Sequence, residues 1–380
     1  MTLRKAKLTQ VTPRKLPEPG APGTAAAASL RPVRRAVVDA RAGLPVLLLG
    51  GTPLVILAAE TATEASLAEF FALSAGTPVL LLAPTRAAAV LHQPVPPGPA
   101  TALLLPPGKL TAAALLALAD PTNTQGPPPA GLATLPAEAE AALVLAKLGR
   151  LLPAVLAAPA GPEAAASLLS VSPGSLLAAA HETAGGLLRA AEARVPLAEA
   201  EDARVVAFRP EDGGIEHMAI LIGRPELAEA PLTRIHSECF TGDLLGSLRC
   251  DCGPQLHQAL RRMNAEGAGV LLYMAQEGRG IGLVNKLRAY ALQDAGLDTL
   301  DANRALGWGA DERSFAPAAT MLKALGITRV RLLTNNPDKV SGLVAHGIEV
   351  AGRVRHAIAA NGVNDAYLET KARRFGHLLG

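Results

Sequence analysis

The sequence predicts an α/β protein of two domains with mixed, α+β-type sheets, in which the second domain carries the chemistry. Three observations lead to this prediction. The chain has 380 residues, which is enough for two domains of ordinary size. Short apolar runs alternate with Ala-rich segments of helical length, as in α/β folds. All three cysteines lie between positions 239 and 252.

The composition excludes several classes of protein. Apolar residues make up 49% of the chain, so it can bury a core, and a net charge of +3 is too small to indicate a nucleic-acid binder. No uninterrupted apolar run is long enough to span a bilayer. Three cysteines cannot build a disulfide framework. We therefore expect a soluble, cytoplasmic protein with no membrane or nucleic-acid partner.

Residues 1–35 are basic and poor in acids, with Glu18 as the single carboxylate. They are expected to form a flexible tail, and an organelle-targeting peptide is the alternative. The basic residues are Arg4, Lys5, Lys7, Arg14, Lys15, Arg31, Arg34 and Arg35.

Residues 36–200 are expected to form the first domain. Its predicted strands cover residues 45–49, 54–58, 79–82 and 102–105. Thr63 is expected to cap a helix over residues 64–75 that Gly76 ends, and residues 137–148 look helical. Loops rich in Pro and Gly follow at 93–99 and 123–136. The charged segment 190–204 is taken as the domain boundary.

Residues 201–380 are expected to form the second domain. The predicted strands are 205–209, 218–222, 231–235, 269–274 and 330–334, and the predicted helices are 256–266, 284–295 and 316–325. Asn336 and Pro337 are typical of the cap and first turn of another helix.

The three cysteines are the strongest chemical signal. Cys239 precedes Cys250 and Cys252, and thiolates are ligands that suit zinc. Three protein ligands leave a fourth position for a water, which zinc activates near neutral pH. Two alternatives remain open here: three buried apolar cysteines, and a structural zinc completed by His236 or His257.

Three other polar clusters follow in the second domain. Residues 276–283, Q-E-G-R-G-I-G-L, lie between a strand and a helix, where glycines let N–H groups approach phosphate; a plain turn is the alternative. Arg279, Lys286 and Arg288 add positive charge there. Asp311 and Arg313 form a pair of a kind that is usually solvated.

Thr334 ends a strand just before a capped helix, a common ligand position in α/β folds. Lys339 lies in the first turn of that helix, where the dipole disfavours a cation. Either a ligand phosphate or solvent exposure would explain this lysine.

Together, and in this order, the clusters closely resemble the GTP cyclohydrolase II family from about residue 204 to residue 380. The matching motifs are R-I-H-S-E-C-x-T-G-D, S-L-R-C-D-C-G, Q-E-G-R-G-I-G-L, N-K-x-R-A-Y-x-L-Q-D, G-x-D-T, A-D-E-R, L-L-T-N-N-P-x-K and the terminal G-H-L-L.

This resemblance implies one Zn²⁺ held by Cys239, Cys250 and Cys252. It implies that Asp311 accepts a proton, that Arg313 attacks the α-phosphate and that Tyr290 lies near the purine. An arginine nucleophile is chemically unusual because its pKa is so high, and electrostatic stabilisation would need the same residue. The implied GTP-contacting residues are Arg234, Ile235, His236, Ser237, Glu238, Gln255, Glu277, Gly278, Arg279, Thr299, Thr334 and Lys339.

The implied reaction is the first step of riboflavin biosynthesis. Mg²⁺ assists on the phosphates while pyrophosphate leaves, and zinc activates the water that opens the guanine ring at C8 and releases formate. A homodimer is also implied. One departure is visible: residues 353–356, R-V-R-H, lack the proline that the family commonly has after the valine, and this segment is expected to lie away from the motifs.

The first domain resembles a degenerate 3,4-dihydroxy-2-butanone 4-phosphate synthase. Residues 37–47, 58–63, 116–121 and 140–151 match parts of that family. Its acidic catalytic loop, with an R-E-N-E-G-D core, is reduced here to G-G-T-P at residues 50–53. The carboxylates that would bind Mg²⁺ and move protons are missing, so this domain is expected to be inactive.

Three other functions are alternatives to this one. A GTP-binding regulator with a dead active site is disfavoured by the intact Cys239, Asp311 and Arg313. A zinc-containing nucleic-acid module is disfavoured by the near-neutral charge. A cyclohydrolase that releases a different ring-opened product stays open, although Tyr290 favours the ordinary one.

Overall fold

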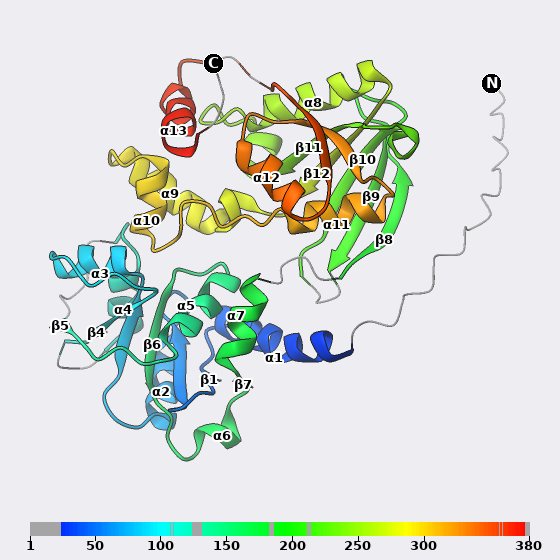
Figure 1. The fold of residues 1–380 in the computed structure, drawn as a ribbon. Coiled ribbons are helices and arrows are strands. Elements are labelled where there is room, and N and C mark those ends of the chain that lie inside the picture. The colour runs from blue at the N-terminus through cyan, green and yellow to red at the C-terminus, as the bar shows by residue number, and fades with distance from the viewer. Residues whose placement is uncertain are drawn as a thin grey trace, which may run out of the picture.

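The computed structural model describes residues 24–106, 108, 110–123, 131–181, 186–210, 214–356, 358 and 360–376. Within these residues the chain forms two seven-stranded sheets, each accompanied by helices (Figure 1). Both sheets contain parallel and antiparallel pairs. The predicted two-domain α/β fold with mixed sheets is therefore confirmed.

The first sheet has the strand order β5-β4-β3-β6-β2-β1-β7. Its strands are β1 (Val46–Leu48), β2 (Leu54–Ala58), β3 (Val79–Leu82), β4 (Thr101–Leu104), β5 (Gly131–Leu132), β6 (Ala154–Pro159) and β7 (Ser170–Val171). The helices of this domain are α1 (Thr24–Arg41), α2 (Glu64–Leu73), α3 (Pro84–Leu91), α4 (Ala112–Ala119), α5 (Ala139–Leu148), α6 (Ala164–Ser167) and α7 (Pro173–His181).

Both faces of this sheet are covered, and strand β2 shows why. Val55 and Leu57 pack into one hydrophobic cluster, with residues of α2, α3 and α4. Leu54 and Ile56 pack into another, with residues of α1, α5 and α7. Because alternate side chains point to opposite faces of a strand, a continuous apolar run indicates a sheet buried on both sides.

The local signals of the first domain were read correctly in most places. Helix α2 is capped by Thr63 as predicted, through a reciprocal bond with Ser66. The expected tail boundary at residue 35 was wrong, because helix α1 begins at Thr24 and buries Val33 and Ala36 against the sheet. Residues 1–23 lie outside the described residues.

The second sheet has the order β14-β13-β11-β12-β10-β9-β8. Its strands are β8 (Leu187–Arg194), β9 (Arg204–Pro210), β10 (His217–Gly223), β11 (Leu232–Ser237), β12 (Ala268–Met274), β13 (Arg329–Leu333) and β14 (Glu349–Val354). Its helices are η1 (Pro225–Leu227), η2 (Phe240–Leu244), α8 (Cys252–Glu266), η3 (Glu277–Gly280), α9 (Leu283–Asp294), α10 (Thr299–Ala305), α11 (Ala316–Ala324), α12 (Pro337–Ala345) and α13 (Asp365–Phe375).

The predicted domain boundary at 190–204 was also wrong. Strand β8 pairs along its length with β9, so residues from Leu187 onward belong to the second sheet. The charged, Ala-rich composition of this segment reflects an edge strand: all but Leu187 of its side chains are exposed.

The two domains pack directly on each other. One hydrophobic cluster contains Leu103 and Leu115 of the first domain together with Leu292, Ala302 and Trp308 of the second. In Figure 1, helices α9 and α10 lie against the first domain near α3. Among the described residues, no helix is both long and apolar enough to cross a membrane.

Candidate functional site

A cavity opens at one edge of the second sheet. Strands β11, β12 and β13 run parallel to one another there, so their carboxyl ends reach the same edge. The segments that follow them supply Glu238, Glu277 and Thr334 to the cavity wall. A ligand commonly binds at this place in α/β folds. The cavity holds about 1180 Å³ of empty space, counting the solvent at its mouth.

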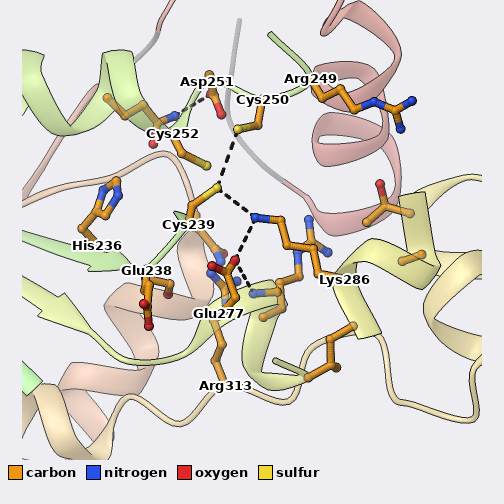
Figure 2. Close-up of a pocket in the computed structure, with 18 of the residues that line it drawn as sticks. His236, Glu238, Cys239, Arg249, Cys250, Asp251, Cys252, Glu277, Lys286 and Arg313 are labelled. Carbon is orange, nitrogen blue, oxygen red and sulfur yellow. Dashed lines mark hydrogen bonds and ion pairs between the residues drawn. The ribbon is translucent and has the colours of Figure 1, made fainter. Parts of the chain in front are cut away.

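Three thiols lie together in this cavity (Figure 2). The sulfur atoms of Cys239, Cys250 and Cys252 all lie within 4.8 Å of one another, and those of Cys239 and Cys250 are 3.8 Å apart. Gly242 makes room for them: a Cβ at Gly242 would lie 2.7 Å from the Cys250 sulfur and 3.0 Å from the Cys239 sulfur. Such a three-thiol cradle fits a tetrahedral zinc ion with one open position.

Neither of the two histidines considered as a fourth ligand completes this group. The Nε2 atom of His236 lies 3.0 Å from a carboxylate oxygen of Asp243. His257 lies 2.7 Å from Glu199 on the surface. Within the described part of the chain the metal-ligating cluster consists of the three cysteines, which favours a catalytic over a structural zinc.

Lys286 supplies the charge that balances the thiols. Its ammonium donates to the Cys239 sulfur at 3.1 Å and to Glu277 at 2.7 Å. Contacts with the Cys250 and Cys252 thiols, together with Lys286, hold the pKa of Cys239 far below its usual range. Burial opposes the charge on Lys286, but the bond to Glu277 and the charge on Cys239 raise its pKa overall. Cys239 is thus prepared as a thiolate ligand.

The fit of Gly242 against the thiols leads to a first prediction. In a Gly242→Ala variant the new methyl group forces the Cys250 sulfur to move, so zinc affinity is expected to fall by about 10- to 100-fold. Competition against a chromophoric zinc chelator measures this. Gly352→Ala is the matched control, because a Cβ there meets nothing within 4 Å. Equal zinc affinity of the two variants would contradict the cradle.

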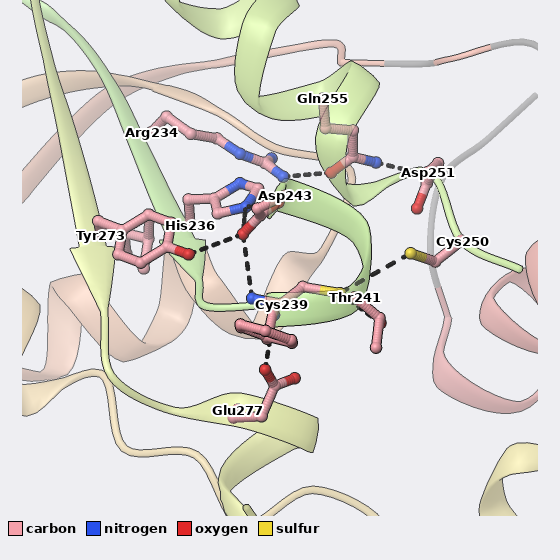
Figure 3. A network of polar contacts seen from close by, with 12 residues as sticks. Arg234, His236, Cys239, Thr241, Asp243, Cys250, Asp251, Gln255, Tyr273 and Glu277 are labelled. Carbon is pink, nitrogen blue, oxygen red and sulfur yellow. Dashed lines mark hydrogen bonds and ion pairs between the residues drawn. The ribbon is translucent and has the colours of Figure 1, made fainter. Parts of the chain in front are cut away.

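Asp243 organises the strand end next to the thiols (Figure 3). Its carboxylate accepts from the Cys239 backbone N–H at 3.0 Å and from the Tyr273 hydroxyl at 2.9 Å, besides facing His236. Burial and the neighbouring carboxylate of Asp243 raise the pKa of Tyr273, so its phenol stays a donor. Asp243 belongs to the first cysteine motif, but the sequence analysis gave it no role; it fixes both a cysteine and a pocket histidine.

The glycine-rich segment after β12 forms a tight turn and not an extended phosphate loop. Gly278, Arg279 and Gly280 all have positive φ, and Arg279 adopts this conformation at +63° without being glycine. Glu277 is buried inside the turn, where one oxygen accepts from the Phe240 N–H at 2.6 Å. The turn therefore ties the cysteine loop to helix α9 through Lys286.

The cavity wall is rich in positive charge. Six basic side chains and three acidic ones occur among its described lining residues. The basic ones are Arg234, Arg249, Arg279, Lys286, Arg313 and Lys339, and the acidic ones are Glu238, Asp251 and Glu277. A concave site with this excess of cations fits an anionic ligand.

Three of these cations, Arg234, Lys286 and Lys339, are buried. Burial lowers the pKa of Arg234 to about 10, which leaves its guanidinium charged at neutral pH. Lys339 is buried too, with its ammonium 2.8 Å from the Ile235 carbonyl, which rules out solvent exposure as the reason for a lysine at this helix start.

Asp311 and Arg313 form a pair at the rim. The Arg313 Nε donates to Asp311 at 2.8 Å, and only 11% of the Arg313 side chain is exposed. Burial opposes ionisation of Asp311, but the hydrogen bonds and charge of Arg313 hold the pKa of that carboxyl below its usual range. Arg313 lines the cavity, whereas Asp311 does not. The pair therefore joins the site through Arg313, while Asp311 stays exposed.

The segment 353–356 does not lie away from the motifs, contrary to expectation. His356 is buried and lines the cavity. Its backbone exchanges two hydrogen bonds with the Asn335 amide, and its ring lies 3.0 Å from the Gln255 carbonyl. Gln255 in turn accepts from Arg234. The departure from the family pattern, at Arg355, is thus next to His356, a residue of the cavity wall.

This histidine leads to a prediction about pH. Burial and the nearby charge of Arg234 lower the pKa of His356 to about 3, below the value of about 6.5 in an unfolded chain. As the pH falls below 6.5, the unfolded chain takes up a proton that the folded chain does not, so stability is lost. Between pH 7 and pH 5 His356 should cost about 2 kcal/mol in the free energy of unfolding.

Urea unfolding at pH 7, 6 and 5 measures this loss. In a His356→Gln variant, whose side chain does not titrate, the decline should be smaller by about the same 2 kcal/mol. An identical pH dependence in both proteins would show that His356 is protonated in the folded state.

The structure brings almost all of the predicted site residues around the cavity. Ile235 and Asp311 are the exceptions: Ile235 turns its side chain into the core and offers its carbonyl to Lys339. The lining residues that sequence reasoning did not assign to the site are Arg249, Asp251, Ile281, Lys286, Ala289, Gln293, Asn303, Asn335, Asn336 and His356. Several of them lie within the quoted motifs, and their place in those motifs could have identified them. Asn303 and His356 lie outside the motifs, so no feature of the sequence indicates them.

One family model and several known sequences are similar to this chain. The family model described as GTP cyclohydrolase II matches residues 188–355. A GTP cyclohydrolase-2 of Azospirillum brasilense is 46% identical over 367 residues, which are 93% of this chain and 95% of that protein. A GTP cyclohydrolase-2 of Pasteurella multocida is 52% identical over 177 residues, 46% of this chain and 81% of that protein.

Among solved structures, a two-domain 3,4-dihydroxy-2-butanone 4-phosphate synthase from A. baumannii is similar with a TM-score of 0.32 and 16% identity. That match covers 85% of this chain and 99% of the other.

Proposed function

The chain belongs to the GTP cyclohydrolase II family, and we propose that it hydrolyses GTP to 2,5-diamino-6-ribosylamino-4(3H)-pyrimidinone 5′-phosphate, formate and pyrophosphate. The observation that carries this proposal is the three-thiol cluster inside a cavity lined by six basic side chains. The thiol cluster suits the opening of a purine ring by an activated water, and the basic side chains suit binding of a triphosphate.

Cys239, Cys250 and Cys252 would hold the zinc ion, and Lys286 favours the anionic form of Cys239. A zinc ion held there would supply the Lewis acidity that activates water near neutral pH. Tyr290 lies beside this group, with its hydroxyl 3.4 Å from that of Thr241. Burial raises the pKa of Tyr290, so its phenol can act as a hydrogen-bond donor near the purine.

Buried polar atoms in the cavity support binding of a polar base. Ser237 Oγ, His236 Nδ1 and Arg234 Nε are buried and have no hydrogen-bond partner among the described protein atoms. Because unpaired buried polar atoms are costly, a ligand is expected to satisfy them. We assign Arg234 to Glu238, Gln255, Glu277 to Arg279, Thr299, Thr334 and Lys339 to GTP binding.

At the phosphate end, Arg313 provides a planar guanidinium held in place by Asp311. We assign to it the stabilisation of charge on the α-phosphoryl group, with Mg²⁺ helping on the other phosphates. A fully charged guanidinium suits this role better than nucleophilic attack does. Asp311, kept as a carboxylate, is the proposed proton acceptor.

The test is incubation of the purified protein with GTP and Mg²⁺, followed by assays for formate and pyrophosphate and by mass spectrometry of the pyrimidine. Release of formate and pyrophosphate with the diaminopyrimidine would support the proposal. Pyrophosphate without formate would indicate a different ring-opened product. GTP binding with no turnover in zinc-loaded protein would indicate a regulator.

We further propose that the first domain, residues 24 to about 186, is an inactive relative of the dihydroxybutanone phosphate synthase fold. The loop of residues 50–53, which joins β1 and β2, contains no carboxylate. The Azospirillum relative, which matches over 93% of this chain, carries the cyclohydrolase name alone. Formation of dihydroxybutanone phosphate from ribulose 5-phosphate by the purified protein would refute this.

A cytoplasmic homodimer is part of the proposal. The cysteine loop exposes Leu244, Leu245 and Leu248, and helix α9 exposes Val284 and Leu287, which supports burial against a second copy. Three thiols with no disulfide among them suit a reducing compartment. Sedimentation equilibrium tests the dimer.

A further inference from the structure

The first domain inserts one charged side chain behind the candidate GTP site. Arg150 follows helix α5 and has a positive φ of 55°, and its side chain reaches the second domain. Its guanidinium donates to the carbonyl of Ala275 at 2.7 Å. Its stem packs on Gly282, where an added Cβ would lie 3.2 Å from both Cβ and Cδ of Arg150.

The backbone turn that Arg150 holds is a junction of the site. Ala275 is followed by Gln276, whose amide donates to the Ser314 carbonyl at 2.7 Å, next to Arg313. Glu277 comes next and binds both the Phe240 N–H and Lys286. Three residues of this turn therefore connect Arg150 to the cysteine loop, to the lysine on Cys239 and to the arginine at the phosphate end.

Arg150 also compensates charge. Burial lowers the pKa of its guanidinium, while the charges of Glu238 and Glu277 act in the opposite direction. Both glutamates line the cavity. Without Arg150, the carboxylates of Glu238 and Glu277 would lose a neighbouring positive charge and would repel an anionic nucleotide more strongly.

Further polar contacts between the domains keep Arg150 in place. Arg288 of helix α9 pairs with Glu60 at 2.9 Å and with Asp120 at 2.7 Å, and all three side chains are at most 16% exposed. Asn285, on the same helix, donates to the Arg150 carbonyl at 2.9 Å. Glu60 accepts from the Leu152 N–H, two residues beyond Arg150. Helix α9, which carries Lys286, is thus fastened to the segment that carries Arg150.

We propose that Arg150 is a positioning residue of the GTP site, and that the first domain, which lacks the synthase carboxylates, serves as part of the framework of the cyclohydrolase active site. This inference rests on the proposed function. Arg150 does not line the cavity, so it acts through the turn from Ala275 to Glu277.

The test compares full-length wild type with Arg150→Met, Arg150→Lys and the control Thr85→Val. Methionine keeps the apolar stem on Gly282 but removes the charge and the donor, and lysine restores one donor. Thr85 bonds the Arg304 carbonyl across the same domain contact at an exposed position and is not part of the cavity. KM and kcat for GTP and bound zinc per chain are measured well below the unfolding midpoint.

For Arg150→Met we expect a raised KM and a fall of about tenfold or more in kcat/KM, since small displacements of a site are costly. Zinc content should be unchanged, Arg150→Lys should recover part of the loss, and Thr85→Val should match wild type. Unchanged KM and kcat in Arg150→Met would overturn the inference. A lower kcat with unchanged KM would also overturn it, because a smaller fraction of folded protein is enough to explain that result.

The wild type separates this inference from the proposed function. If wild type shows no turnover, the proposed function fails, and the affinity for GTP from titration calorimetry replaces KM as the readout. A weaker affinity in Arg150→Met then supports the positioning role, and an equal affinity refutes it.

Discussion

Replacing Cys250 by serine should abolish formate release. Serine keeps the size of the side chain but offers a poor ligand for zinc compared with a thiolate. Cys250 lies 3.8 Å from Cys239, and both are buried. Because the described metal-ligating cluster contains the three cysteines alone, no other described histidine or carboxylate is placed to replace the lost ligand. Losing several kcal/mol of transition-state stabilisation raises the activation free energy and corresponds to a decrease of about 10³-fold or more in kcat.

The measurement is kcat for formate together with zinc per chain. We expect less than stoichiometric zinc in Cys250→Ser and a normal unfolding transition, because the surrounding core does not depend on the sulfur. Ser247→Ala in the same loop is the control, since its hydroxyl lies outside the cavity wall. A Cys250→Ser protein that retains zinc and releases formate at the wild-type rate would disprove the thiol site.

An Arg313→Lys substitution should lower kcat by about 10²- to 10³-fold while zinc stays bound. Lysine preserves the charge but cannot keep the two-pronged contact by which the Arg313 Nε and its neighbouring nitrogen bind Asp311. The ammonium is therefore expected to lie away from the α-phosphoryl group, and pyrophosphate and formate should both decline.

Arg329→Lys is the matched control, because Arg329 forms surface ion pairs with Glu229 and Glu349 and does not line the cavity. Normal pyrophosphate release with loss of formate alone in Arg313→Lys would contradict a role at the phosphate. That result would instead indicate that Arg313 acts in the ring-opening step.

The tests on Cys250 and Arg313 separate the two halves of the site. The thiol substitution removes the metal and leaves the phosphate cations, whereas the arginine substitution leaves the metal. The Arg150 variants change neither group directly. If the Cys250, Arg313 and Arg150 variants all show the same change in zinc content and kinetics, a general loss of folded protein would explain it. Different changes in the three variants would support their separate roles.

Much of this protein was readable from local sequence. The strands over residues 54–58 and 79–82 and the caps at Thr63 and Asn336 were predicted correctly, because they depend on apolar pattern and on side chains within three residues. The three cysteines were predicted as one site, and their sulfurs do lie together. The family followed from motifs of the same local kind.

The domain limits were not readable in this way. Helix α1 begins at Thr24, because its apolar residues pack on a sheet that is formed by later segments. Strand β8 belongs to the second domain, because it pairs with β9. An exposed edge strand and a surface helix have compositions similar to those of a linker or a tail, and their partners alone distinguish them.

The sequence by itself determined the grouping of the three cysteines, the motif residues and the alternation of strands and helices, since each is recorded in neighbouring positions. Only the tertiary structure decided that His356 lies behind Arg234, that Lys339 is buried on the Ile235 carbonyl, and that Arg150 reaches Ala275 from another domain. These contacts join residues about 100 or more positions apart, and chain folding, not local preference, brings such residues together.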